Sequence, residues 1–300
     1  RTLNELDGVF SFVLYDTIND KVFAARDQLG IRSLFYSTDE NKEITMASEM
    51  KARNGNSYIS QFPPGSYLDL NTGIFYKYAP FRYLNAGNVT GYEYKEDVTR
   101  NIEKNIRKLL TSAVNKRQMS DRPVGCLLSG GLDSTLVTAL VSKHYPEFGL
   151  NTYSIGLSGS VDLKYAKIAA KYLKTNHTTI ELTEKEFLSA IEETIYVIES
   201  YDTTTVRASV GNYLVSKYIK ENSEDTVIFC GDVSDEIFGS YRGFTKAPSM
   251  QDFNIANQDM LESIHFFDVL RSDKSISGAG LEARVPFGDK KLVDYVMRMS

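Results

Sequence analysis

The fold is decided by residues 127–134, which read Leu-Leu-Ser-Gly-Gly-Leu-Asp-Ser. The residues just before them, 124–126, are mainly apolar, and with the two leucines they predict a short buried strand over 124–128. Residues 135–140 follow, with apolar side chains at helical spacing. The sequence therefore predicts a strand that turns through two glycines into the first turn of a helix.

A turn of this kind favours an anion, most often a phosphate. Gly130 and Gly131 let the backbone turn tightly and approach a ligand closely. The first amides of the helix lack internal partners and carry the positive end of its dipole. Ser129 and Ser134 add hydroxyl donors, whereas Asp133 would repel a phosphate unless Mg²⁺ lay between them. A Gly-rich turn without a ligand is the alternative. The GxxxxGK[ST] and GxGxxG patterns are absent, which excludes Walker-type and Rossmann sites.

Length and composition are those of an ordinary globular protein. The chain has 300 residues, 42% hydrophobic and 24% charged, which predicts about two domains. The net charge is −5 and no basic run is interleaved with aromatic residues, so we expect no nucleic-acid binding. No apolar run is long enough to span a bilayer, so we expect no membrane insertion. Cys126 and Cys230 indicate free buried thiols in a reducing cytosol.

The first 82 residues predict β structure. Runs of apolar and aromatic residues separated by turn signals predict strands over 8–15, 21–25, 33–36, 44–47, 66–70 and 74–78. Little helix lies between them, which favours an antiparallel sheet with at least one buried face.

The middle of the chain separates two domains. Residues 86–94 are rich in Gly and Asn and have no period, which is typical of a linker. Residues 98–114 predict an amphipathic helix that packs under the domain that follows. We therefore expect a first, partial domain over 1–85, a linker and helix over 86–122, and a second domain over 123–300.

Strands and helices alternate in the second domain. The expected strands are 124–128, 152–157, 177–182 and 226–230, and the expected helices lie near 132–144, 162–174, 184–199 and 208–221. This alternation predicts an α/β fold with a parallel sheet covered on both faces. Ligands of such sheets bind at the carboxyl ends of the strands. Residues 129–134, 154–156 and 230–236 follow three of these ends and are the candidate ligand loops.

The third of these loops is acidic. Asp232, Asp235 and Glu236 directly follow a buried strand. Acids in the first turn of a helix are favoured by its dipole, so helix capping alone would explain them. A loop that binds phosphate next to a loop that offers carboxylates instead favours a metal-nucleotide site, with Mg²⁺ bridging the two.

Other polar segments have two interpretations. Residues 201–207 read Tyr-Asp-Thr-Thr-Thr-Val-Arg and predict a polar break between helices, because threonine is a poor helix former. They either cap a helix or present hydroxyls and Arg207 to a carboxylate. A further group of charged residues lies at helical spacing, and its default interpretation is a solvated helix face: Asp268, Arg271, Asp273 and Lys274. Arg284 stands between apolar residues, which is costly unless it is paired.

Taken together, these residues resemble the family of glutamine-hydrolysing asparagine synthetases, nearly from end to end. The turn at 129–134 resembles the pyrophosphate loop of ATP pyrophosphatases. Further blocks that look like those of the family lie at 26–32, 47–52, 62–67, 201–209, 234–239 and 280–287. The resemblance implies an ATP pyrophosphatase-type domain, similar to adenine nucleotide hydrolases, preceded by the β-rich C-terminal half of an N-terminal-nucleophile amidotransferase domain.

The resemblance also implies a cytoplasmic ligase with two sites. An amidotransferase domain would hydrolyse glutamine with an N-terminal Cys. The synthetase domain would use Mg-ATP to adenylate the β-carboxylate of aspartate, with release of pyrophosphate, and ammonia would then displace AMP to give asparagine. The implied ligands are small molecules, with ATP and Mg²⁺ as cofactors. The oligomeric state is left open, with a homodimer as one option.

The resemblance assigns roles by position. Residues of the catalytic centre and the aspartate contacts would be Asp232, Thr204, Thr205 and Arg207, with Asp268 and Arg271 in the same pocket. ATP would lie against Leu127, Ser129, Gly130, Gly131, Asp133, Ser134, Ile155, Cys230 and Gly231. Mg²⁺ would be held by Asp133 and Asp235, and the amino group of glutamine by Asp7.

The chain also departs from the family. Asp232 stands where the family has a Glu that assists formation and aminolysis of the adenylate. Its side chain is shorter by about one C–C bond, whereas catalytic groups tolerate a displacement of only about 0.5 Å. Val233 stands for Gly, Asp273 for Asn and Ser33 for Pro. The chain starts at Arg1 and lacks the N-terminal nucleophile, so we expect it to be part of a longer protein and not to hydrolyse glutamine alone.

Two alternatives remain at this stage. A synthetase similar to the β-lactam synthetases would act on another carboxylate, although the block at 204–207 favours aspartate. A non-catalytic relative would keep only nucleotide binding or a scaffold role, and Asp232 and Val233 are its only support.

Overall fold

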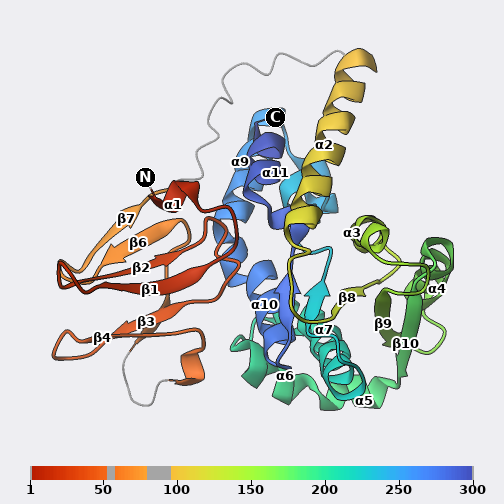
Figure 1. Cartoon of the computed structure of the whole chain (residues 1–300), viewed down its shortest axis with the longest axis horizontal. Helices are drawn as coiled ribbons and strands as arrows, with labels where there is room; N and C mark the ends of the chain where they lie inside the picture. The colour runs from red at the N-terminus through yellow and green to blue at the C-terminus, as the bar shows by residue number, and fades with distance from the viewer. Residues whose placement is uncertain (1, 53–57, 80–95, 299–300) are drawn as a thin grey trace.

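The computed structural model describes residues 2–52, 58–79 and 96–298. The residues before the linker, 2–52 and 58–79, form a β-rich part that we call the front region. It lies beside the part formed by residues 96–298, with strands and helices, which we call the rear region (Figure 1). The rear region contains a five-stranded sheet whose four pairs of neighbouring strands are all parallel, so the predicted α/β fold is confirmed. The predicted linker over 86–94 lies outside the described residues. No helix in the described ranges is both long and apolar enough to cross a membrane.

The front region consists of two antiparallel sheets rather than the one predicted. The core residues Ala24, Leu34, Phe62 and Leu68 pack the sheets together. Strand β5 was not predicted, because three residues are too short to show a period. The four-stranded sheet has the order β1-β2-β6-β7, with β1 Ser11–Asp16, β2 Lys21–Arg26, β6 Ser66–Asp69 and β7 Ile74–Lys77. The three-stranded sheet has the order β4-β3-β5, with β3 Phe35–Thr38, β4 Ile44–Ala47 and β5 Ile59–Gln61.

The rear sheet has the order β10-β9-β8-β11-β12. Its strands are β8 Val124–Leu127, β9 Asn151–Leu157, β10 Asn176–Leu182, β11 Val227–Phe229 and β12 Glu282–Arg284. The four predicted strands are confirmed, but β12 was missed because Glu-Ala-Arg has no strand pattern. Arg284 is paired after all, since its Nε lies 3.0 Å from Glu282 Oε1 and its guanidinium also donates to the carbonyls of Arg117 and Met119.

Helices pack around this sheet: α3 against β8, α4 against β9 and β10, α7 against β9, and α10 against β12. The predicted amphipathic helix is confirmed as α2, which packs against α3 and α11. The helices are α1 Thr2–Glu5, α2 Glu96–Lys116, α3 Leu132–Val141, α4 Val161–Leu173, α5 Glu184–Ser189, α6 Ile191–Ile198, α7 Thr203–Asn222, α8 Ser234–Phe238, α9 Met250–Ser263, α10 Asp268–Ser277 and α11 Lys290–Met297.

Two helix predictions were wrong in detail. The helix expected over 184–199 is broken at Ala190 into α5 and α6. Helix α7 begins at Thr203, whereas the sequence predicts a break through residue 207. The reason is a local cap: Asp202 accepts hydrogen bonds from the amide and the hydroxyl of Thr205, both at 2.8 Å. This N-cap outweighs the low helix propensity of the threonines.

The prediction that the charged residues of α10 face solvent is wrong for Asp273 and Lys274, because both are buried against the front region. Asp273 accepts from Arg32 Nη1 at 2.8 Å, and from the amide and hydroxyl of Ser33 at 3.1 and 2.9 Å. Lys274 is 1% exposed and donates to Glu199 at 2.6 Å. Helix α10 therefore joins the front region to the rear region, as its central place in Figure 1 indicates.

Asp289 makes stability pH-dependent. It is 2% exposed and lies 2.8 Å from Arg117 Nη1 and 2.6 Å from Lys116 Nζ. Burial opposes its charge, but these two partners lower the pKa of Asp289 below the ordinary 3.8. Its contribution is therefore fully present above pH 3.8 and is lost as the pH falls through the lowered pKa.

We therefore expect Asp289→Asn to lower the free energy of unfolding at pH 7 by about 2 kcal/mol. Below pH 4 the difference from the unmodified protein should shrink, because protonation removes the same charge. Urea unfolding from pH 7 to pH 3 measures both effects. The matched control is Asp294→Asn, which breaks an exposed pair with Arg298 and should change little. A difference that stays constant with pH would contradict the assignment.

Candidate active site

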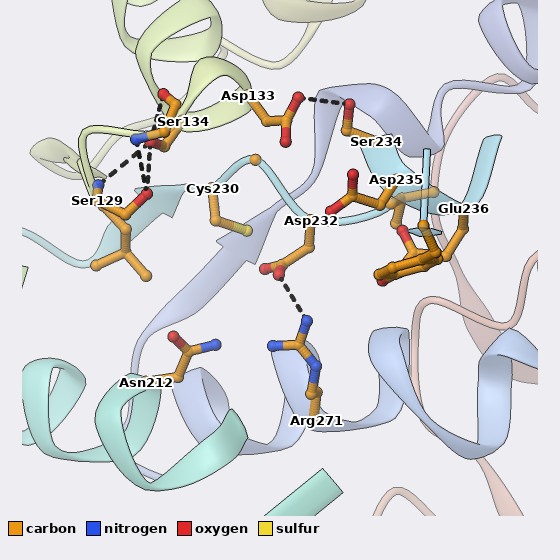
Figure 2. A pocket seen from close by; sticks show the side chains of 15 residues that line it. Ser129, Asp133, Ser134, Asn212, Cys230, Asp232, Ser234, Asp235, Glu236 and Arg271 are labelled. Atoms are coloured by element: carbon orange, nitrogen blue, oxygen red, sulfur yellow. Dashed lines mark hydrogen bonds and ion pairs between the residues drawn. The ribbon is translucent and has the colours of Figure 1, made fainter. Parts of the chain in front are cut away.

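A cavity of about 210 Å³ opens where β8 and β11 end. The strands pair in parallel, with Cys126 opposite Phe229, so the loops that follow them lie side by side. Figure 2 shows these two loops above Asn212 of α7 and Arg271 of α10. The lining residues are Leu127, Ser129, Gly131, Asp133, Ser134, Asn212, Cys230, Gly231, Asp232, Val233, Ser234, Asp235, Glu236, Tyr241 and Arg271.

The loop after β8 is held by its own hydroxyls. The Oγ atoms of Ser129 and Ser134 lie 2.9 Å apart, and Ser134 Oγ also accepts from the amide of Ser129 at 3.2 Å. The amide of Gly131, the N-cap of α3, donates to Ser129 Oγ at 3.3 Å, and no side chain caps this helix. The start of α3 thus faces the cavity, in the arrangement that binds phosphate.

The two glycines of this loop have different roles. Gly130 has φ +84°, and a Cβ there would lie 2.4 Å from the amide nitrogen of Ala166, so this glycine allows close packing on α4. It does not line the cavity. Gly131 has φ −72°, and its Cβ would meet only Ser129 Oγ, at 3.4 Å. Gly131 therefore keeps space open for a ligand.

Carboxyl groups form the opposite wall. Asp133 Oδ1 accepts from Ser234 at 2.8 Å, and burial raises the pKa of Asp133, with Asp235 and Asp232 adding to the rise. Glu236 is 2% exposed, and burial raises its pKa to about 7. Several carboxyl groups therefore share the cavity, their crowding opposes full ionisation, and a bound cation would relieve the repulsion between the ionised ones.

Asp232 has two partners on α10. Its Oδ2 accepts from the hydroxyl of Ser272 at 2.7 Å, and its Oδ1 lies 3.4 Å from Arg271 Nη2 (Figure 2). Asp268 also holds Arg271, at 3.0 Å from its Nε. Burial opposes the charge of Arg271, but these two carboxylates raise its pKa above the ordinary value. The guanidinium therefore remains charged at the edge of the cavity.

Val233 has φ +78° and is 1% exposed. A β-branched side chain in the left-handed region is strained by about 1–2 kcal/mol. Gly would adopt this conformation without strain, so a valine at this position restricts the loop.

A second cavity, of about 580 Å³, adjoins the first and shares Tyr241 and Arg271 with it. Thr204, Thr205 and Asp268 line this second cavity, so most of the residues expected around a carboxylate substrate do come together. Some candidate residues lie elsewhere.

Besides Gly130, three candidates do not line either cavity. Arg207 is exposed on α7, and Ile155 packs against the core of the rear region. Asp7 lies in the front region and forms ion pairs with Lys116 at 2.7 Å and Lys291 at 3.3 Å.

Two residues that line the smaller cavity, Asn212 and Tyr241, were not predicted. Asn212 lies seven residues after Thr205 on α7, and so on the same face of the helix. A correct prediction of the start of α7 would have identified it. Tyr241 follows α8 in a segment without a sequence signal, and its hydroxyl donates to Glu236 at 2.5 Å.

Comparison with known sequences defines the class of protein. The sequence model of the Asparagine synthase family matches residues 105–259 and 254–300, and that of the Glutamine amidotransferase domain matches residues 1–54. The chain therefore belongs to the asparagine synthase family, and the resemblance predicted from its sequence is confirmed.

Individual relatives agree. The chain is 38% identical over 321 residues to the asparagine synthetases [glutamine-hydrolyzing] of Cricetulus griseus and Homo sapiens, and 39% identical over 326 residues to that of Gallus gallus. These matches cover 100% of this chain but 57% of each relative. Among solved structures, an NH3-dependent NAD synthetase from Campylobacter jejuni has a TM-score of 0.32 and 22% identity, over 47% of this chain and 60% of that chain, which is too distant to bear on function.

The two glycines provide a paired test of the phosphate loop. We expect Gly131→Ala to keep its stability but to bind Mg-ATP at least about tenfold more weakly, because the methyl group would fill the space left for a phosphate. Gly130→Ala should instead lower the melting temperature, because its Cβ would collide with α4. Calorimetric titration and thermal unfolding measure the two effects. Unchanged nucleotide affinity in folded Gly131→Ala would exclude this loop as the phosphate site.

Proposed function

We propose that the protein is a synthetase that uses ATP to activate the β-carboxylate of aspartate and then forms asparagine. The observation that carries this proposal is the pair of adjoining cavities. One combines a loop suited to phosphate with an acidic wall, and the other offers threonine hydroxyls and Arg271. Arg271 and Tyr241 stand where the two meet, so a carboxylate in one cavity would face a nucleotide in the other.

The proposed reaction has two steps. A β-carboxylate oxygen of aspartate attacks the α-phosphorus of ATP, the bond to the bridging oxygen breaks, and pyrophosphate leaves. Ammonia then attacks the activated carbonyl carbon, loses a proton, and AMP leaves with the electrons of the acyl–oxygen bond. Arg271 would orient the aspartate, the loop at 129–134 would hold the phosphates, and Asp232 would accept the proton of the ammonium.

Asp133 and Asp235 fit a Mg²⁺ ion in chemical type. They face one cavity from two loops, and their mutual repulsion is the condition that a divalent cation removes. Among the described residues no three His, Cys, Asp or Glu side chains form a complete metal cage. Mg²⁺ is commonly held by one or two carboxylates together with substrate phosphates, so two suffice. When bound, it would neutralise charge on the phosphates.

The wider assignments belong to the same proposal. The match over residues 1–54 supports a glutamine site in the whole protein, with residues 1–85 as part of its domain, and Asp7 as a contact of the glutamine amino group. The other proposed domain boundaries place a linker and helix at 86–122 and a synthetase domain at 123–300. The buried thiols of Cys126 and Cys230 support a cytoplasmic location. Ile155 and Arg207 would need to move to reach the ligands.

The full-length protein, supplied with Mg-ATP and ammonia, tests the function. We expect pyrophosphate release that depends on aspartate, together with formation of asparagine and AMP in equal amounts. Release with another carboxylic acid in preference to aspartate would assign the chain to a different synthetase. Nucleotide binding without release would identify a non-catalytic relative.

A separate prediction concerns the activity that the short side chain of Asp232 supports. Arg271 and Ser272 both reach Asp232, so we expect it to be active as it stands. Asp232→Asn should lower kcat by about 100-fold, because it removes the charge while keeping the shape. Asp232→Glu should stay within about tenfold of the unmodified protein. A larger gain on Asp232→Glu would show that the aspartate is too short for the reaction.

A further inference from the structure

Three segments of the chain meet at one buried ion pair. Lys274 of α10 donates from its Nζ to Glu199 Oε2 at 2.6 Å and to the carbonyl of Ser48 at 2.8 Å. Glu199 Oε1 in turn accepts from the amide of Lys51 at 2.8 Å. The side chains of Lys274 and Glu199 are 1% and 5% exposed. We call this group of four residues the junction.

One arm leads from the junction to the smaller cavity along α10. Ser272 and Arg271 lie two and three residues before Lys274, and both bond Asp232. Because α10 is a continuous helix over these positions, the anchoring of Lys274 fixes the height and rotation of both side chains.

The other arm leads to the larger cavity. Glu199 ends α6 in a left-handed conformation, with φ +57°. Three residues later, Asp202 caps α7 through the amide of Thr205. Asp202, Thr204 and Thr205 all line the larger cavity. Two walls of the larger cavity, the first turn of α7 and the first half of α10, would face a carboxylate there. Both walls are thus connected through the chain to the same ion pair, between Glu199 and Lys274.

The chemistry of the junction favours a positioning role over a stabilising one. Two apolar side chains of similar volume usually stabilise a buried site as well as an ion pair does, because the charges must be desolvated. An ion pair, however, fixes direction, and here its hydrogen bonds select one carbonyl and one amide of the front region. Substitutions that keep the buried volume but remove the charges can therefore test the effect of orientation separately from that of burial.

We propose that Glu199 and Lys274 are positioning residues, which hold both walls of the carboxylate cavity in register with the front region. This proposal rests on the proposed function, because it assigns the cavity to aspartate. Both residues act through others: Lys274 through Arg271 and Ser272, and Glu199 through Asp202 and Thr205.

The test uses the full-length protein with Glu199→Gln, which keeps the shape, and the double variant Glu199→Gln/Lys274→Met, which removes both charges. We expect the KM for aspartate to rise by about tenfold or more, with the affinity for Mg-ATP unchanged. Amide hydrogen exchange should quicken over 203–206 and 268–272. A matched control is Glu193→Gln/Lys217→Met, which removes an exposed 3.2 Å ion pair between α6 and α7 and should alter none of these.

The outcomes separate the possibilities. A rise in KM together with faster exchange on both walls, in variants that melt close to the unmodified protein, supports the proposal. An unchanged KM with unchanged exchange overturns it, as does an equal loss of aspartate and ATP binding that follows a loss of folded protein. If the unmodified protein releases no pyrophosphate with aspartate, the proposed function fails, and exchange on the two walls alone still decides the role of the junction.

Discussion

Parallel pairing between β8 and β11 is the constraint on which the site depends. It brings a loop of hydroxyls and a loop of carboxylates to the same edge of the sheet, although 95 residues, 135–229, lie between the two loops. The approach is close: a Cβ at Gly231 would lie 2.7 Å from the amide nitrogen of Ser134. Any other residue at 231 would push the loops apart and separate the amides at the start of α3 from the carboxyl groups that face them. The position of this glycine thus follows from contact between the loops rather than from a turn.

The charges of the site follow from that contact. Asp133 and Asp235 come from different loops and face one cavity, and the positive charge nearest to them on α10, Arg271, is already engaged by Asp232 and Asp268. Phosphate groups alone would increase this negative charge. Under the proposed function, a nucleotide would arrive with a divalent cation that offsets this charge. The sequence predicted that the two loops meet at one edge of the sheet, and the structure shows that residues of both loops line one cavity.

The sequence predicted those parts of the fold whose signals are local. Strands β8 and β11 are short apolar runs, and the loops at their carboxyl ends carry the polar residues of the site. It failed where partners lie far away along the chain. Strand β12 is recognisable only through its pairing with β11. Asp273 and Lys274 have the spacing of an exposed helix face, yet their partners Arg32 and Ser48 lie more than 200 residues earlier. Nothing within α10 itself distinguishes a charge that faces water from one that faces another domain.

Two of the departures from the family meet in space. The resemblance drawn from the sequence implies a proline at 33 and an asparagine at 273 in the family, whereas here the amide and hydroxyl of Ser33 both donate to Asp273 Oδ2. A proline at 33 has no amide proton to give, so the carboxylate at 273 gains two donors that the usual family pair does not supply. A third departure, Asp232, is reached by Ser272 and Arg271 from the same helix. Because α10 carries all these contacts, the substitutions at 33, 232 and 273 belong to one connected set.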